Sequence, residues 1–446
     1  MKRTLLVLLL LAPLANAQVP DATYIWPQHD DVQEALNAVA ETDWETLHTI
    51  GTSESGKPLV LAEITDPQSD VPMSERVVTL ITTQQHGNEP AGTPAAIQLL
   101  NDIRTGGAIT STLSNQVLLL WPQANPDGAL ANTRGNAGGT DLNRDHVHVE
   151  EPEAKALHEV ILQQWDVHVG MDHHEYSGTG LGYPVPVRTY DWDATILYPR
   201  HGNVREPTQN QAESMYDALV AGLATDGYNA GEYGVQTVAG VPVSHVAGGP
   251  DPGILRNNFG LNNVAGLLVE TFVNPGNPLV TPERRIDIHY QVMQDTLTYG
   301  HEHAAALMDA KRASERLNVE QPLDQYLEVW PADPVTGEPN SGNRVGPLAE
   351  AYLAAGPLEQ YMARHGLPGG HNGTDGWTYN MVHERQGLLA AILHPDSSRR
   401  VAELSPTEPV IVPVQAEPAD VPDEESPALP VALLLVALAL LARRTA

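Results

Sequence analysis

The stretch from Gln84 to Pro90 places a histidine and a glutamate, His86 and Glu89, three residues apart in the chain. It follows an apolar, β-branched run at 76–83 that predicts a buried strand, and it precedes a predicted helix over 91–103. In open α/β sheets, ligands bind at the carboxyl ends of the strands. Imidazole and carboxylate are ligands that zinc accepts, so the pair indicates either two metal ligands or a polar turn that caps the helix.

Two later strand ends also carry polar side chains that an apolar core does not require. A predicted strand over 167–171 leads to His173 and His174, and a predicted strand over 266–271 carries Glu270. Alternation along a strand allows only one of two adjacent histidines to face a metal. Two histidines and one glutamate make a three-ligand zinc site with one position left open, which is the catalytic arrangement. Glu270 is then the carboxylate available as a general base.

A polar loop follows the predicted strand over 116–122. It contains Arg134, Asp141, Asn143 and Arg144. An arginine beside a metal can polarise a carbonyl and stabilise an oxyanion. A second arginine, with an asparagine beside it, can hold a substrate carboxylate through two hydrogen bonds. The loop therefore offers the groups that hydrolysis of an amide next to a free carboxylate requires.

The order of elements predicts an α/β fold: a mixed, mostly parallel sheet with helices on both faces, followed by a small C-terminal α+β unit. The catalytic domain is expected over 18–310 and the small unit, to which we assign no role, over 311–400. The segment 226–263 is rich in Gly, Pro and Asn and predicts loops over the site. Pro282 to Met308 predicts one long closing helix, in which Arg284 and Arg285 are expected to form structural ion pairs.

Both ends of the chain resemble targeting segments. Residues 1–17 have a basic start, an apolar run and an Ala-Asn-Ala cleavage site, which predicts a secretory signal. Residues 401–428 predict a disordered Pro-rich acidic stalk. The apolar tail at 429–446 ends near two arginines and predicts a sorting signal or a membrane anchor. We therefore expect an exported protein, periplasmic or extracellular, that associates with the membrane if the tail is retained.

Composition excludes several function classes. The chain has 24 basic and 56 acidic residues, a formal net charge of −32, which argues against a nucleic acid partner. It contains no cysteine, so disulfides, a thiolate nucleophile and cysteine-ligated metals are excluded. A metal must therefore be bound by histidine and carboxylate. The sequence does not determine the oligomeric state.

Taken in order, these motifs resemble those of the zinc carboxypeptidases of the M14 family, the carboxypeptidase A type. His86-Gly87-Asn88-Glu89 resembles the H-x-x-E pair, and Asn125-Pro126-Asp127-Gly128 resembles the family's N-P-D-G turn. Residues 141–144 resemble D-x-N-R, and 172–174 resemble D-x-H. The resemblance covers about 47–308.

The resemblance implies one zinc ion per chain, held by His86, Glu89 and His174, so that His174 rather than His173 is the third ligand. It implies Glu270 as the catalytic base and acid. It also implies Arg134 as the residue that polarises the scissile carbonyl.

For the substrate, the resemblance implies that Asn143 and Arg144 bind the terminal carboxylate of a peptide. It implies that Asp141 hydrogen-bonds a zinc histidine and fixes its tautomer. The loop tyrosine of the digestive members is missing, because no tyrosine lies between Tyr233 and Tyr290. Arg256 is expected to line the site in its place. Asp251 would favour a basic C-terminal residue and Arg256 an acidic one, and this choice stays open.

The predicted function is a secreted metallocarboxypeptidase acting on peptides with a free C-terminus. Deacylases of the aspartoacylase and succinylglutamate desuccinylase type share the H-x-x-E and D-x-N-R patterns and are the first alternative. A carboxypeptidase that trims peptidoglycan is the second. A non-catalytic binder of peptide C-termini is the third, although a binder has no use for Glu270.

Overall fold

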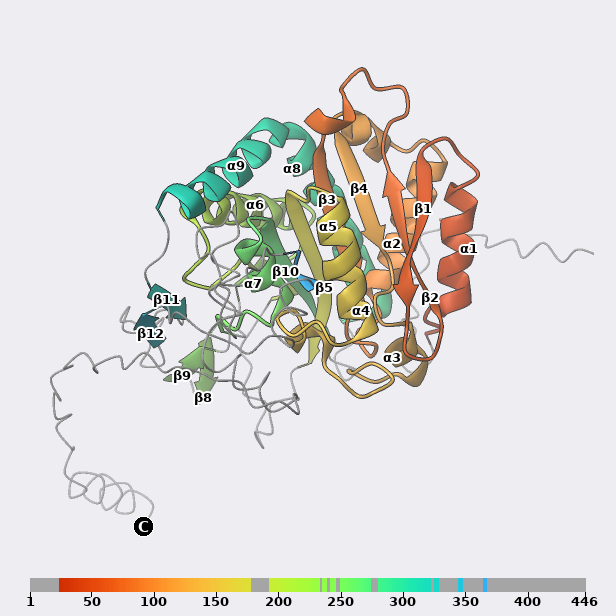
Figure 1. Cartoon of the computed structure of the whole chain (residues 1–446). Helices are drawn as coiled ribbons and strands as arrows, with labels where there is room; N and C mark the ends of the chain where they lie inside the picture. Colours follow the sequence, from red (N-terminus) through yellow and green to blue (C-terminus); the bar gives the residue numbers. More distant parts are fainter. Residues whose placement is uncertain are drawn as a thin grey trace, which may run out of the picture. The chain divides into compact units, whose positions relative to one another are not determined.

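The computed structural model describes residues 24–177, 192–232, 235–238, 241–245, 249–273, 280–321, 325–328, 344–347 and 364–366. Within them lies an eight-stranded sheet with the order β1-β2-β4-β3-β5-β10-β6-β7 (Figure 1). Its strands are β1 (Glu45–Thr52), β2 (Pro58–Ile64), β3 (Val77–Thr83), β4 (Gln116–Trp121), β5 (Val169–Ser177), β6 (Ala194–Leu197), β7 (Ala230–Gly231) and β10 (Ala265–Val273). Strands β4, β3, β5 and β10 are parallel to one another, and β1 and β2 pair antiparallel at one side. At the other side, β6 pairs antiparallel with β10 and parallel with β7. The predicted mixed, mostly parallel sheet is confirmed.

Helices cover both faces of the sheet, because its central strands are apolar on both sides. In β3, Val77 and Ile81 belong to one core, and Val78 and Leu80 belong to the other. The first core is closed by α1 (His29–Val39), α2 (Gly92–Arg104), α6 (Glu206–Thr225), α8 (Pro282–Glu302) and α9 (Ala304–Glu320). The second is closed by the π-helical turn η5 (Ala156–Ile161), the flanking α4 (Pro152–Lys155) and α5 (Leu162–Gln164), and α7 (Leu255–Leu261).

The remaining described elements are short. They are η2 (Met73–Glu75), η3 (Ala108–Ser114), α3 (Pro126–Ala131), η4 (Leu142–Arg144), the hairpin β8 (Val235–Val238) and β9 (Val241–His245), and the pair β11 (Gln325–Glu328) and β12 (Arg344–Pro347). The last pair falls within the predicted small C-terminal unit.

Helix α7 corrects the prediction that 226–263 consists of loops. Its Phe259 packs on two strand glycines, since a Cβ at Gly170 or Gly266 would come within 2.7 Å or 2.5 Å of Phe259 atoms. The helix buries all seven of its residues, including two asparagines and an arginine. The polar composition of this segment therefore gave no indication of a buried helix. The helix fits against the sheet because β5 and β10 have glycines where Phe259 packs.

The closing helix also differs from the prediction. It is divided at His303 into α8 and α9, and α9 continues to Glu320, so the domain boundary predicted at 310 falls inside a helix. Helix α9 is joined to α6 by hydrogen bonds from the Thr208 backbone N to Ser314 Oγ (3.1 Å) and from Arg205 Nε to Asn318 Oδ1 (2.6 Å). These contacts attach α9 to the sheet-containing domain.

A short segment of the predicted small unit contacts the catalytic domain. His365 Nε2 donates to the carbonyl of Val147 (2.8 Å), and Arg364 Nη1 donates to the carbonyl of His148 (3.0 Å). The predicted signal peptide, stalk and apolar tail lie outside the described residues. Among the helices that are described, none combines the length and apolar character needed to cross a membrane.

Candidate active site

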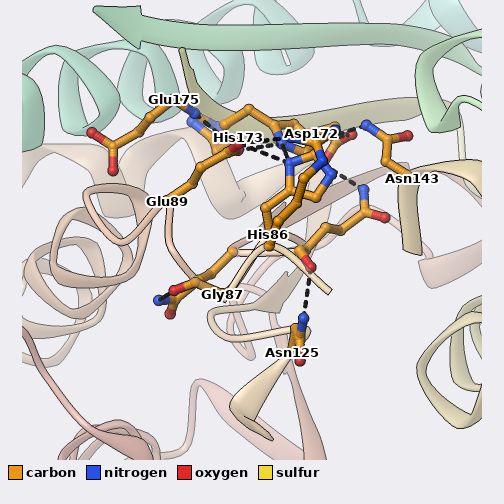
Figure 2. A network of polar contacts seen from close by, with 12 residues as sticks. His86, Gly87, Glu89, Asn125, Asn143, Asp172, His173 and Glu175 are labelled. Carbon is orange, nitrogen blue, oxygen red and sulfur yellow. Dashed lines mark hydrogen bonds and ion pairs between the residues drawn. The ribbon is translucent and has the colours of Figure 1, made fainter. Parts of the chain in front are cut away.

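Three predicted metal ligands converge at the carboxyl ends of β3 and β5. His86 and Glu89 lie on the turn between β3 and α2, and His174 lies within β5, which extends to Ser177 rather than ending at Met171 (Figure 2). His86 Nδ1 is 2.9 Å from Glu89 Oε1, and His174 Nδ1 is 2.7 Å from Glu89 Oε2 and 3.0 Å from His86 Nδ1. All three side chains are buried. In the described part of the chain this is the one group arranged to hold a metal ion.

The geometry and the proton positions of the three residues fit zinc. Tetrahedral donors about 2 Å from a zinc ion lie about 3.3 Å apart, close to the separations seen here. The far nitrogen of each histidine is occupied by a carboxylate: His86 Nε2 is 2.9 Å from Asp141 Oδ1, and His174 Nε2 is 2.8 Å from Asp172 Oδ2. These carboxylates keep the proton on Nε2, so that both Nδ1 lone pairs are directed at the shared position. His86, Glu89 and His174 could therefore hold one zinc ion.

The turn that carries His86 and Glu89 is braced by the Asn125–Gly128 turn. Asn125 Nδ2 donates to the carbonyl of Gln85 (3.0 Å) (Figure 2). Asn125 Oδ1 accepts from the backbone N of Gly128 (2.8 Å). The two turns touch directly, because a Cβ at Gly87 would lie 1.9 Å from the carbonyl carbon of Gly128. Two of the sequence motifs thus form one packed unit, and glycine is required where their backbones meet.

Asp141 links three groups of the site. Its Oδ1 accepts from His86 Nε2 (2.9 Å) and from the backbone N of Asn143 (3.0 Å), and its Oδ2 accepts from Arg134 Nε (2.9 Å). Burial would raise the pKa of Asp141, but the hydrogen bond and charge of His86 and the charge of Arg134 hold it well below its usual range. Arg134 is about half exposed and its Nη1 lies 3.3 Å from Glu89 Oε1. The arginine therefore reaches over the metal position from the solvent side.

Asn143 and Arg144 occupy different environments. Asn143 is buried, its Oδ1 accepts from the backbone N of Leu255 (2.8 Å), and its Nδ2 lies 3.1 Å from His174 Nε2. Arg144 is exposed and its Nη1 donates to the carbonyl of Asn143 (2.6 Å). The oxygen of the Asn143 amide is thus engaged by the backbone of Leu255, whereas the Arg144 guanidinium lies at the surface. Their predicted role in binding a carboxylate stays a prediction.

Glu270 lies beside His174 in the sheet. The parallel register of β10 and β5 pairs the two residues directly, which puts both side chains on the same face. On its other side, Glu270 is paired with Thr195 of β6. Glu270 is partly exposed, unlike the buried apolar residues that precede it in β10. The carboxylate predicted to act as base is therefore a neighbour of the metal ligands.

The contacts described do not bring two other predicted residues, Arg256 and Asp251, to the three metal ligands. Arg256 is only 2 % exposed, and its Nη2 donates to the carbonyl of Gly249 (2.8 Å). Asp251 accepts from the backbone N of Gly253 (2.8 Å). Both hold the backbone around the start of α7, and the predicted part of Arg256 in lining the site stays a prediction.

His173, the alternative third ligand, faces the opposite side of the sheet. Its Nδ1 lies 2.9 Å from His289 Nδ1 of α8, and burial lowers the pKa of His173 to about 3. On the same side, Glu175 accepts from the backbone N of Ala91 (2.9 Å) and forms a buried ion pair with Arg285 (3.0 Å). The predicted ion pairing of Arg285 is confirmed. The sequence did not identify Glu175 as its partner, nor the bond by which Glu175 holds the backbone next to the turn of His86 and Glu89. The available signal was a further carboxylate, Glu175, directly after His174 in the chain.

Comparison with known proteins agrees with this geometry. Residues 32–251 match the zinc carboxypeptidase family. The matched region, about half of the chain, belongs to that family. A carboxypeptidase 2 from Trichophyton rubrum is 26 % identical over 257 residues, which is 55 % of this chain and 47 % of the relative. Carboxypeptidase SOL1 from Arabidopsis thaliana is 29 % identical over 145 residues, covering 29 % of each chain.

The similarity to the fungal carboxypeptidase covers only part of each protein. The chain spans about half the length of the fungal relative. Among solved structures, a metallo-carboxypeptidase from Burkholderia cenocepacia aligns with a TM-score of 0.48 at 15 % identity, covering 61 % of this chain and 68 % of that one.

Proposed function

We propose that this protein is a metallocarboxypeptidase that removes the C-terminal residue from peptides in a zinc-dependent reaction. The observation that supports this most strongly is the convergence of His86, Glu89 and His174, with Arg134 above them and Glu270 beside them. Membership of the zinc carboxypeptidase family supports the same conclusion. We also propose that the protein is exported through its N-terminal signal and associates with the membrane if its apolar tail is retained.

In the proposed mechanism, His86, Glu89 and His174 would hold the zinc ion. When bound, zinc lowers the pKa of a water molecule and polarises the substrate carbonyl. Glu270 accepts a proton from the attacking water and later donates it to the leaving amine. Arg134 donates hydrogen bonds to the carbonyl oxygen as negative charge develops on it.

The substrate's end is proposed to be recognised by charge. The exposed guanidinium of Arg144 is suited to a bidentate bond with the terminal carboxylate. Asn143 is buried beside it, and because its Oδ1 accepts from Leu255 N, only its Nδ2 could donate to the substrate carboxylate. We therefore assign most of the carboxylate binding to Arg144.

The deacylases remain the alternative, because small N-acyl amino acids also present an amide next to a free carboxylate. The Asn125–Gly128 turn, which is packed against the metal turn, favours the peptidase. Peptides of the bacterial cell wall remain a second substrate class within the same chemistry.

The test uses the chain without its predicted signal peptide and compares three substrates: a peptide with a free C-terminus, the same peptide amidated, and N-acyl amino acids. Mass spectrometry follows the products with and without a zinc chelator. We expect chelator-sensitive loss of single C-terminal residues, and little cleavage of the amidated peptide. Glu270→Gln should retain zinc and lose most of the activity. Cleavage of N-acyl amino acids alone would assign the protein to the deacylases, and equal rates on free and amidated peptides would contradict the carboxypeptidase.

A further inference from the structure

A continuous line of hydrogen bonds runs from the back of the metal site into the protein interior. His174 Nε2 is 2.8 Å from Asp172 Oδ2, and Gln85 Nε2 donates to Asp172 Oδ1 (2.7 Å) (Figure 2). His146 Nε2 donates to Gln85 Oε1 (2.8 Å), and His146 Nδ1 is 3.1 Å from His158 Nε2. All five side chains are buried. Asp172 therefore lies between a metal ligand and an amide that is itself held by a histidine.

The chemistry of Asp172 fixes the direction of each bond in this line. Both oxygens of Asp172 are bonded, Oδ1 by Gln85 Nε2 and Oδ2 by His174 Nε2, and a carboxylate only accepts. The Gln85 amide must then present its NH₂ to Asp172 and its oxygen to His146. Burial lowers the pKa of His146 to about 3, so this histidine is neutral, carries its proton on Nε2 and accepts at Nδ1 from His158. This order of protons keeps the His174 proton on Nε2, away from the metal.

The Gln85 amide is not fully enclosed by neighbouring side chains, so hydrogen bonds are needed to fix its orientation. A small cavity lies against Gln85 and His146 and is also lined by Thr82, Trp121 and Glu153. An amide next to such a space can turn unless both of its ends are bonded. His146 bonds the oxygen end, and His146 is itself anchored because its carbonyl accepts from Asn258 Nδ2 (2.8 Å).

We propose that Gln85 and His146 are positioning residues for the zinc site. They hold the Asp172 carboxylate where it accepts from His174 Nε2, which keeps the Nδ1 of His174 aimed at the metal. The inference rests on the proposed zinc site, but it concerns metal affinity rather than the reaction. Neither residue touches the metal or the substrate.

The test measures zinc affinity of the metal-free full chain by competition with a chromophoric chelator. Gln85→Met keeps the length of the side chain and removes both hydrogen bonds. His146→Leu removes the donor, while His146→Gln keeps an amide N–H near the position of Nε2. The matched control is His168→Leu, because His168 is equally buried and accepts from the backbone N of Val78 (3.1 Å), at the opposite end of β5.

We expect Gln85→Met to weaken zinc binding by about 10- to 100-fold, the usual effect of removing a group that orients a metal ligand. His146→Leu should weaken it by about tenfold, and His146→Gln should restore most of the affinity. The double variant should match Gln85→Met alone, because both residues act through Asp172. Cobalt substituted for zinc should show an altered absorption spectrum in the weakened variants. His168→Leu should lower thermal stability and leave the zinc affinity unchanged.

Wild-type zinc affinity in Gln85→Met would overturn the proposal. Should Gln85→Met fail to fold, equal affinities of His146→Leu and His146→Gln would overturn it equally well. A wild-type protein that binds zinc but trims no peptide would refute the proposed function and leave this inference standing. If the wild type trims peptides and the Gln85 and His146 variants bind zinc normally, this inference is refuted and the proposed function stands.

Discussion

Replacing Asp141 by Asn should separate the two tasks that this carboxylate performs. In the wild type, one oxygen accepts from His86 Nε2 and from the Asn143 backbone, and the other accepts from Arg134 Nε at 2.9 Å. An amide has only one acceptor oxygen. If that oxygen stays with His86, the NH₂ group faces the N–H of Arg134 and the arginine is released.

The magnitudes differ for the two tasks. Losing the charge that orients His86 should weaken zinc binding by about 10- to 100-fold, or about 1.4–2.7 kcal/mol. The ion pair with Arg134 is about half exposed on the arginine side, so its loss should change the free energy of unfolding by less than about 1 kcal/mol. At saturating zinc, kcat should fall about 10- to 100-fold, because Arg134 is present but no longer held over the carbonyl.

The assay pairs a zinc titration of the metal-free protein with kcat measured at saturating zinc. Asp145→Asn is the matched control, because the Asp145 carboxylate accepts from the backbone N of Glu150 and Glu151 and lies outside the contacts of the three ligands. It should change stability without changing zinc affinity. If Asp141→Asn binds zinc within about twofold of wild type and keeps its kcat, the assignment of both tasks to Asp141 is wrong.

Three further predictions concern the support of the site and its pH dependence. Arg285→Met should lower the free energy of unfolding by about 3–5 kcal/mol in urea titrations, because the buried Glu175 carboxylate would lose the positive charge beside it. A milder loss in the double variant with Glu175→Gln would be consistent with this account, and no loss in the single variant would contradict it. Burial raises the pKa of Glu45 from 4.5 to about 8, so the free energy of unfolding should fall as pH rises between these values. Glu45→Gln should therefore add about 2 kcal/mol near pH 9, after allowance for partial exposure, and almost nothing near pH 5. Equal gains at both pH values would refute this prediction. Gly87→Ala should abolish zinc binding in the same titration, because its Cβ would overlap the Gly128 backbone; normal affinity would show that the two turns can separate.

Local patterns in the sequence were enough to predict the α/β class and to propose His86 and Glu89 as metal ligands, and the family resemblance implied His174 as the third. Runs such as Val77–Thr83 are apolar on both faces, which indicates a buried strand wherever it occurs. His86 and Glu89 are close in the chain, and their side-chain chemistry suits one metal. Strand ends meet at one edge of a parallel sheet, so Glu270 and one of the two histidines at 173–174 could be added without knowing the order of strands.

Long-range register decided the rest. His174 rather than His173 joins the ligands because β5 lies beside β3 with His173 opposite Thr83, which turns His173 toward α8. Helix α7 exists because Phe259 packs on glycines of two other strands. The bonds that join Gln85, Asp172 and His146 cross between segments about 60 to 90 residues apart in the chain. No local period encodes such contacts, because they depend on which strands are neighbours and on the faces that their side chains share.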